Sequence, residues 1–208
     1  MKRIVWDWNG TLFDDVELSF SVINRLLQKY HLEQLENIEK YQSVFEFPIE
    51  NYYRKMGFDL EKIDFSVLAQ QYMDDYQPKS KNCSLRKEAL EALAYCKEKE
   101  IGQCVLSASK KINLLEQIDR LGISDYFDGI FGMDNIEASG KLECAKQLKT
   151  KYKGDTITII GDSFHDYQLA QELGFDCILV TGGHQDIRKA PTICDDVLES
   201  VKSVYENN

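Results

Sequence analysis

The pattern of apolar and polar positions begins with a short hydrophobic run, Ile4–Trp6, that ends at Asp7. A run of this length before a polar loop is typical of a buried strand. Apolar residues then recur at helical spacing in three segments, 18–30, 48–57 and 65–76. Pro78 is expected to end the last of these helices at residues 77–80, because proline disrupts a helix interior. Residues 15–80 are therefore predicted to be wholly helical.

Beyond residue 84 the pattern alternates between helices and strands. Helices are predicted over 85–96, 112–122, 142–152, a segment ending at 174, and 197–205, and strands over 101–106, 129–131, 156–160 and 177–180. Such alternation predicts an α/β fold with a doubly wound parallel sheet. Because the first strand belongs to the same sheet, we expect a core of residues 1–14 and 81–208, interrupted by a helical insertion over 15–80.

Acidic residues follow two of the predicted strands. Asp7 comes directly after the first strand, and Asp162 and Asp166 follow the β-branched run at 156–160. Open α/β sheets bind their ligands at the carboxyl ends of strands, so these three carboxylates are expected to converge. Carboxylates at close range raise one another's pKa unless a cation shares the site. Hard oxygen ligands, without a cluster of thiols or imidazoles, indicate Mg²⁺ rather than zinc.

A hydroxyl and an ammonium complete a candidate phosphate site. Ser107 ends the strand predicted at 101–106, and the backbone amides from Ala108 onward are free to hold a phosphate oxygen. Lys141 directly precedes the helix predicted at 142–152, where it can neutralise developing phosphoryl charge. Taken singly, a serine that caps a turn and a solvated lysine explain these residues equally well. Their order along the chain, together with the acidic residues, favours the phosphate site.

Composition and charge exclude several classes of protein. The chain has 208 residues with 25 Lys and Arg against 35 Asp and Glu, which gives a net charge of -10. This balance disfavours binding to a nucleic-acid backbone, so no nucleic-acid partner is expected. No secretory leader and no apolar run long enough to span a membrane are recognised. Six cysteines without a CxxC pair fit a reducing, cytoplasmic location.

The order of these motifs resembles that of the haloacid dehalogenase superfamily, and the layout is similar to its phosphoglycolate phosphatase-like members. The resemblance rests on Asp7 with Gly10 and Thr11, then Ser107, then Lys141, and finally Gly161 and Asp162 with Asp166. It spans nearly the whole chain. It implies a Rossmann-like core with a helical cap and a Mg²⁺-dependent phosphatase that acts on a small phosphorylated metabolite.

The resemblance also implies a role for each matching residue. Asp7 would attack phosphorus and carry an aspartyl-phosphate. The metal would bind Asp7, Asp162, Asp166 and the backbone carbonyl of Asn9. The phosphoryl group would contact Ser107, Ala108 and Lys141, and Thr11 would support the loop. The oligomeric state is left open.

Asn9 departs from the family pattern, which most often has an aspartate two residues after the nucleophile. That aspartate protonates the leaving group and later activates water, and an amide does neither. General acid–base catalysis contributes ~10²–10⁴-fold, so we expect a weakened phosphatase. Three explanations stay open: a proton supplied by His165 or by the substrate, an engineered substitution, and deamidation at Asn9-Gly10.

Two further functions also remain open on the sequence alone. Loss of the acid–base group is compatible with a module that binds a phosphorylated ligand without turnover. It is equally compatible with a phosphotransferase, because an aspartyl-phosphate lives longer when no base activates water.

Overall fold

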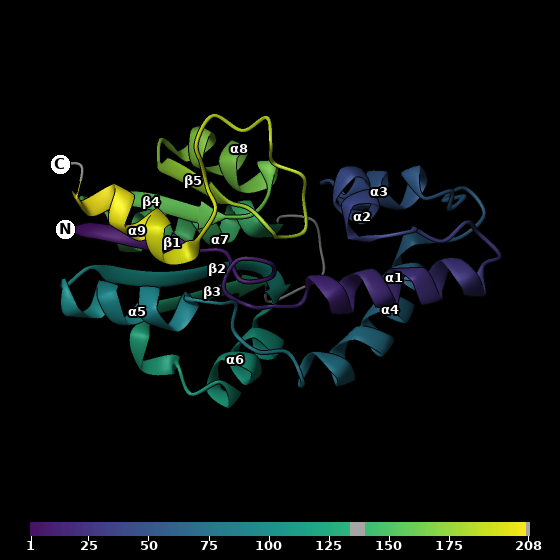
Figure 1. Ribbon diagram of the computed structural model, residues 1–208, viewed down its shortest axis with the longest axis horizontal. Coiled ribbons are helices and arrows are strands. Elements are labelled where there is room, and N and C mark those ends of the chain that lie inside the picture. Colours follow the sequence, from purple (N-terminus) through teal and green to yellow (C-terminus); the bar gives the residue numbers. More distant parts are fainter. Residues whose placement is uncertain (134–139, 207–208) are drawn as a thin grey trace.

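A six-stranded sheet forms the centre of the computed structural model, which describes residues 1–133 and 140–206 (Figure 1). Neighbouring strands are parallel throughout, in the order β3-β2-β1-β4-β5-β6. The strands are β1 Lys2–Trp6, β2 Gly102–Lys110, β3 Gly129–Met133, β4 Thr156–Gly161, β5 Asp176–Val180 and β6 Ile193–Cys194. The first strand therefore lies in the middle of the sheet, and its carboxyl end is flanked by those of β2 and β4.

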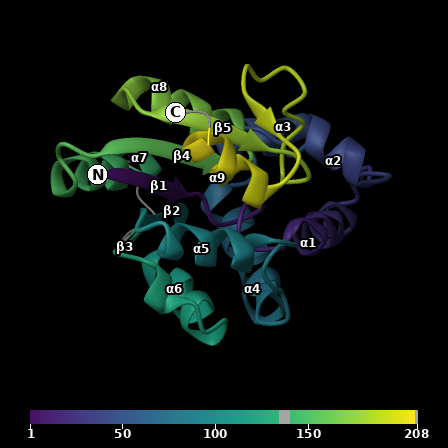
Figure 2. The same cartoon turned by 60° about the vertical axis from the view of Figure 1, so that its left-hand side comes forward.

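Helices cover both faces of the sheet (Figure 2). One face packs against α5 (Ala89–Glu98), α6 (Lys111–Arg120) and α9 (Val197–Glu206), and the other against α7 (Gly140–Lys151) and α8 (Phe164–Leu173). A short 3-10 turn, Ser124–Tyr126, precedes β3. Because β1 is buried on both faces, its last three residues, Ile4–Trp6, are apolar without alternation, as is typical of central parallel strands.

The segment between β1 and α5 folds as four helices that stand beside the sheet (Figure 1). They are α1 Val16–Lys29, α2 Ile38–Val44, α3 Ile49–Lys55 and α4 Phe65–Ser80. We call them the helical insertion. Their apolar faces form a separate hydrophobic cluster that includes Ile23, Leu27, Tyr53 and Leu68. The insertion thus has its own packed interior, distinct from the two layers around the sheet.

The predicted fold class is confirmed, and some of its details are wrong. Helix α4 continues through Pro78 to Ser80, so the predicted break at 77–80 does not occur. Proline stands in the last turn here, where it removes only one helical hydrogen bond. Strand β2 extends past 106 to Lys110, and helix α2 and the two-residue strand β6 were not expected. Among the described helices, none has the length and apolar character needed to cross a membrane.

The two leucines of α5 test the packing of this core. Leu93 is fully buried under the sheet, whereas Leu90 is 50% exposed on the same helix. We expect Leu93→Ala to lower the free energy of unfolding by ~2–5 kcal/mol because it leaves a cavity. Leu90→Ala should change it by less than about 0.5 kcal/mol. Urea denaturation measures both, and equal losses would contradict this assignment of the core.

Candidate active site

The candidate residues gather at the carboxyl edge of the sheet, at the ends of β1, β2 and β4. Asp7 follows β1, and its backbone amide donates to the Ile160 carbonyl oxygen at 2.8 Å, which ties it to β4. The next residues form a tight loop, because the Trp8 carbonyl oxygen accepts from the amides of Thr11, Leu12 and Phe13. The chain then leaves the sheet and enters the helical insertion.

Lys141 lies between two of the predicted carboxylates. Its Nζ donates to Asp7 Oδ1 and, at 2.5 Å, to Asp166 Oδ1, and all three side chains are buried. Asp166 Oδ2 accepts in addition from the amide and the hydroxyl of Ser163 at 3.1 and 2.6 Å, which caps α8. Burial lowers the pKa of Lys141, but the two carboxylates outweigh it and raise that pKa. The lysine is therefore charged.

Asp162 completes an acidic cluster with Asp7 and Asp166. One oxygen of each of the three carboxylates lies within 4.8 Å of the others. Burial, together with the charges of Asp166 and Asp162, raises the pKa of Asp7 to about 8 against the opposing effect of Lys141. Burial also raises the pKa of Asp162. A cluster of hard oxygens in which two of the three carboxylates resist ionisation fits a divalent cation such as Mg²⁺.

Thr11 and Ser107 line the same space. Thr11 Oγ1 lies 3.5 Å from Asp7 Oδ2 and 3.4 Å from Asp162 Oδ1, so it bridges the two carboxylates. Ser107 is buried in β2, where its Oγ accepts from the amide of Ser109 at 3.0 Å. Ala108, between these two serines, is half-buried. The hydroxyl hydrogen of Ser107 remains available to a phosphate oxygen.

The side chain of Asn9 is fully engaged. Its Nδ2 donates to Asp15 Oδ2 at 2.8 Å and to the Tyr76 hydroxyl at 3.0 Å, and its Oδ1 accepts from Ser109 Oγ at 2.9 Å. The amide orientation follows from these partners, because only the oxygen can accept from the serine hydroxyl and only the nitrogen can donate to a carboxylate. The side chain at position 9 is therefore a neutral amide whose orientation is fixed by its hydrogen bonds.

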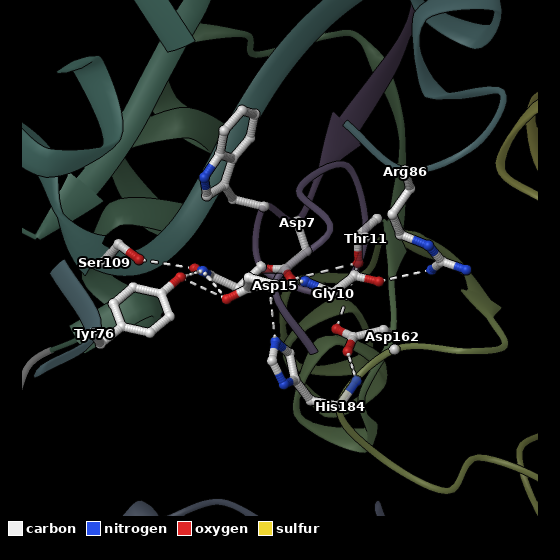
Figure 3. A network of polar contacts seen from close by, with 12 residues as sticks. Asp7, Gly10, Thr11, Asp15, Tyr76, Arg86, Ser109, Asp162 and His184 are labelled. Atoms are coloured by element: carbon white, nitrogen blue, oxygen red, sulfur yellow. Dashed lines mark hydrogen bonds and ion pairs between the residues drawn. The ribbon is translucent and has the colours of Figure 1, made fainter. Parts of the chain in front are cut away.

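The site also includes residues that were not among the predicted ones, among them Asp15, Tyr76, Arg86 and Ser109 (Figure 3). Arg86 joins the loop after β1 to the loop after β5, because its guanidinium donates to the carbonyl oxygens of Gly10 and Thr181, both at 2.7 Å. Their contacts join segments that are far apart in the chain. No local motif around any of them signals the role.

His184 connects the acidic cluster to the helical insertion. Its amide donates to Asp162 Oδ2, its Nε2 lies 3.2 Å from Asp15 Oδ1, and its Nδ1 lies 2.7 Å from the Tyr41 hydroxyl of α2. Burial lowers the pKa of His184, but Asp15, Asp162 and Asp7 outweigh it and raise that pKa to about 9. Asp15 therefore favours the protonated form of the imidazole, while the backbone amide of His184 contacts Asp162.

His165, the other candidate proton source, lies on α8. It stacks against Phe47, with ring centroids 4.4 Å apart, and burial lowers its pKa. Its Nδ1 has no hydrogen-bond partner among the described residues. The role of His165 stays a prediction.

Two glycines allow the backbone to approach the Asp162 side chain closely. Gly10 has a φ of +71°, and a Cβ built on it meets Asp162 Oδ2 at 2.4 Å. A Cβ on Gly183 meets the same carboxylate at 2.2 Å without a positive φ. Gly122 offers the opposite case, with a φ of +69° and nothing within 4 Å.

These three glycines separate backbone strain from steric crowding. We expect Gly122→Ala to cost ~1–2 kcal/mol of unfolding free energy through its left-handed backbone alone. Gly183→Ala should lower the free energy of unfolding because its Cβ displaces Asp162. Gly10→Ala should lower it more than either of the other two substitutions, because it combines the strained backbone with the clash. Urea denaturation of the three variants measures the order. A Gly10→Ala loss no larger than that of Gly122→Ala would contradict the crowding at Asp162.

Comparison with known proteins shows the family and the fold of this chain. The sequence pattern of the haloacid dehalogenase-like hydrolases matches residues 4–180. No curated protein matches the chain. The fold is similar to that of a haloacid dehalogenase-like hydrolase from Streptococcus pneumoniae (19% identity, 98% of each chain covered, TM-score 0.82). It is also similar to a predicted phosphatase from Clostridium acetobutylicum (20% identity, 99% of this chain and 98% of that one, TM-score 0.81).

A third solved structure, a predicted phosphoglycolate phosphatase from Haemophilus somnus, has 18% identity, 98% coverage of both chains and a TM-score of 0.72. At these identities the solved structures establish the fold alone. The family match covers most of the chain and includes the strands that carry Asp7, Ser107 and Asp162. This chain belongs to the haloacid dehalogenase-like hydrolases.

Proposed function

We propose that the protein is a Mg²⁺-dependent phosphatase that moves a phosphoryl group from a small metabolite to Asp7 and then to water. The observation that carries the proposal is the buried contact of Asp7 with Lys141 beside Asp162 and Asp166. A nucleophilic carboxylate needs a neighbouring cation when an anionic substrate approaches it. This site offers the ammonium and room for a metal.

The metal site is proposed from the donors present. The carboxylates of Asp7, Asp162 and Asp166, with the backbone carbonyl of Asn9, would hold Mg²⁺. When bound, the ion neutralises charge on the phosphoryl oxygens and lowers the repulsion among the three carboxylates.

The proposed first step is attack of an Asp7 carboxylate oxygen on phosphorus. The bond from phosphorus to the leaving oxygen breaks, and its electron pair departs with the leaving group. Ser107 and Lys141 donate to the transferring phosphoryl oxygens, with the amide of Ala108 beside them, and Thr11 holds the carboxylate. A water oxygen then attacks phosphorus, the bond between phosphorus and the Asp7 oxygen breaks, and the Asp7 carboxylate is regenerated while the released phosphate carries the proton from water.

The identity of residue 9 bears on which substrates react. The amide of Asn9 is held by Asp15, Tyr76 and Ser109, and it carries no acidic proton. A leaving group that departs as a stable anion, such as an acyl or aryl oxygen, needs no proton at that moment. We therefore infer a preference for such phosphates.

The helical insertion, taken as residues 15–80, is proposed to act as a cap that excludes water and selects the substrate. Its helices α2 and α4 already contact the site through Tyr41 and Tyr76. Such a cap favours small molecules over nucleic acid, in agreement with the charge of -10. We propose a cytoplasmic enzyme on the basis of the cysteine usage.

Phosphoryl transfer to an acceptor other than water is the second candidate. The observation in its favour concerns Asn9, whose amide is fixed by hydrogen bonds to Asp15 and Ser109. Most members of the family have the water-activating aspartate at this position. Its signature is a phosphorylated Asp7 that an added alcohol discharges faster than water does. A module that binds a phosphorylated ligand without any turnover is the remaining alternative.

Metal binding has a direct thermodynamic test. Mg²⁺ should raise the melting temperature of the protein, because a ligand that binds only the folded state stabilises it. Asp162→Asn should lose this shift, and its metal-free melting temperature should be at least as high as that of the unchanged protein, since like-charge repulsion falls. The matched control is Asp176→Asn, an exposed carboxylate at the opposite end of the sheet, which should keep the shift. A Mg²⁺ shift retained in Asp162→Asn would refute the proposed metal site.

The reaction itself is tested by comparing leaving groups. With Mg²⁺ present, kcat for p-nitrophenyl phosphate and an acyl phosphate should exceed that for a simple alkyl phosphate by ~10²–10⁴-fold, the usual contribution of a general acid. Asp7→Asn should abolish all of these activities. Full activity in Asp7→Asn would exclude the proposed mechanism, and equal rates for aryl and alkyl esters would show that another group supplies the proton.

A further inference from the structure

Asp15 occupies the N-cap position of α1, yet its side chain does not cap the helix. An aspartate at this position ordinarily accepts from an amide of the first helical turn, which stabilises the helix by about 1 kcal/mol. Here the carboxylate, 1% exposed, points back toward the loop after β1. A buried N-cap residue whose side chain does not cap its helix is expected to serve another purpose in the structure.

Four donors from three segments, the loop after β1, α4 and the loop after β5, converge on this carboxylate (Figure 3). Its Oδ1 accepts from the Gly10 amide at 2.9 Å and lies 3.2 Å from His184 Nε2. Its Oδ2 accepts from Asn9 Nδ2 at 2.8 Å and from the Tyr76 hydroxyl at 2.6 Å. Each oxygen therefore has two partners, which is the full complement that allows a charged carboxylate to remain buried.

The contact between Asn9 and Asp15 excludes a second carboxylate. Asn9 Nδ2 lies 2.8 Å from Asp15 Oδ2. An aspartate at position 9 would place an acceptor oxygen there, against a carboxylate that has no proton to donate. Two carboxylates at this range do not both ionise. The amide at position 9 and the carboxylate at position 15 are thus chemically complementary.

We propose that Asn9 and Asp15 form a matched pair, in which Asp15 carries the negative charge beside the reacting centre and acts as the positioning residue of the catalytic loop. The proposal rests on the proposed function for its consequence in catalysis. Tyr76 of α4 ties the pair to the helical insertion, and His184 ties it to the loop after β5. Ser109 holds the far side of the Asn9 amide.

The arrangement makes the loop after β1 depend on the docked helical insertion. Tyr76 donates directly to Asp15, and Tyr41 of α2 contacts the imidazole of His184. The backbone amide of that same histidine donates to Asp162. Displacement of the insertion would therefore remove partners from Asp15 and loosen the residues next to Asp7. Since Asp15 has no proposed contact with substrate, its loss should lower kcat and leave KM largely unchanged.

A charge exchange tests the pair directly. Asn9→Asp alone should lower both the urea midpoint and kcat, because it opposes two carboxylates. Asp15→Asn alone should also lower them, because it withdraws the acceptor of Tyr76 and Asn9. In the double variant Asn9→Asp/Asp15→Asn, the amide oxygen at position 15 keeps the Gly10 and His184 donors while its NH₂ group faces the new carboxylate. The double variant should recover most of the midpoint and at least a tenfold higher kcat than Asn9→Asp.

A second pair of variants decides the question if the exchange variants do not fold. Tyr76→Phe removes one hydroxyl from the network and keeps the ring, which stacks on Tyr72 with centroids 5.7 Å apart. It should lower kcat several-fold with little change in KM. The matched control is Tyr72→Phe on the same helix, whose hydroxyl contacts Ser19 outside the network and whose loss should leave kcat unchanged.

The outcomes separate this proposal from the proposed function. The urea midpoints of the single and double variants report on the pair even if no phosphatase activity is found. Additive losses of stability in the double variant would overturn the matched pair. So would a kcat that rises about 100-fold in Asn9→Asp alone, or equal kinetics for Tyr76→Phe and Tyr72→Phe in an active enzyme.

Discussion

The repulsion among the three buried carboxylates Asp7, Asp162 and Asp166 is the constraint on which the rest of the site depends. Two like charges about 4 Å apart cost on the order of 4 kcal/mol at an effective dielectric constant near 20. Lys141 offsets part of this cost because its ammonium contacts Asp7 and Asp166. When all three carboxylates are ionised, one ammonium still leaves an excess of negative charge. The fold tolerates this excess because strand and helix ends fix the side chains there, and the excess is what a divalent cation would complete.

The same electrostatic problem recurs next to this cluster, at Asp15, where protein groups alone compensate the buried charge. Asp15 is as deeply buried as Asp166, but its carboxylate has four hydrogen-bonding partners, one of which is the imidazole of His184. The pKa of His184 is raised to about 9, because the attraction of Asp15 and Asp162 exceeds the cost of burial. The histidine therefore carries a positive charge between the two acidic groups. The backbone amide of His184 contacts Asp162, and its ring contacts Asp15. The position of His184 therefore couples the geometry of the three-carboxylate cluster to that of Asp15 and its partners.

What the sequence could predict follows from where each residue lies along the chain. Asp7 and Asp162 directly follow strands and Ser107 lies in the last part of β2, and parallel strands bring their carboxyl ends to one edge, so their convergence follows from topology. Asp15 and Tyr76 lie in the segment whose pattern predicts only helices, and no spacing rule relates them to Asn9. Pro78 shows the same limit on a smaller scale, since its effect depends on its distance from the end of α4.

Asn9 illustrates why a departure from a family pattern is poorly understood in isolation. Considered alone, an amide in place of the usual aspartate is a lost acid–base group. Beside Asp15 it donates to a buried carboxylate at 2.8 Å, and in the proposed pair Asp15 carries the negative charge beside the loop. The physical requirement is one negative charge beside the loop after β1, with a complete set of hydrogen-bond donors. A carboxylate at position 9 or one at position 15 can meet this requirement. A family member with asparagine at this position should therefore be judged by the residue that faces the amide, since that partner determines whether the loop remains ordered for chemistry.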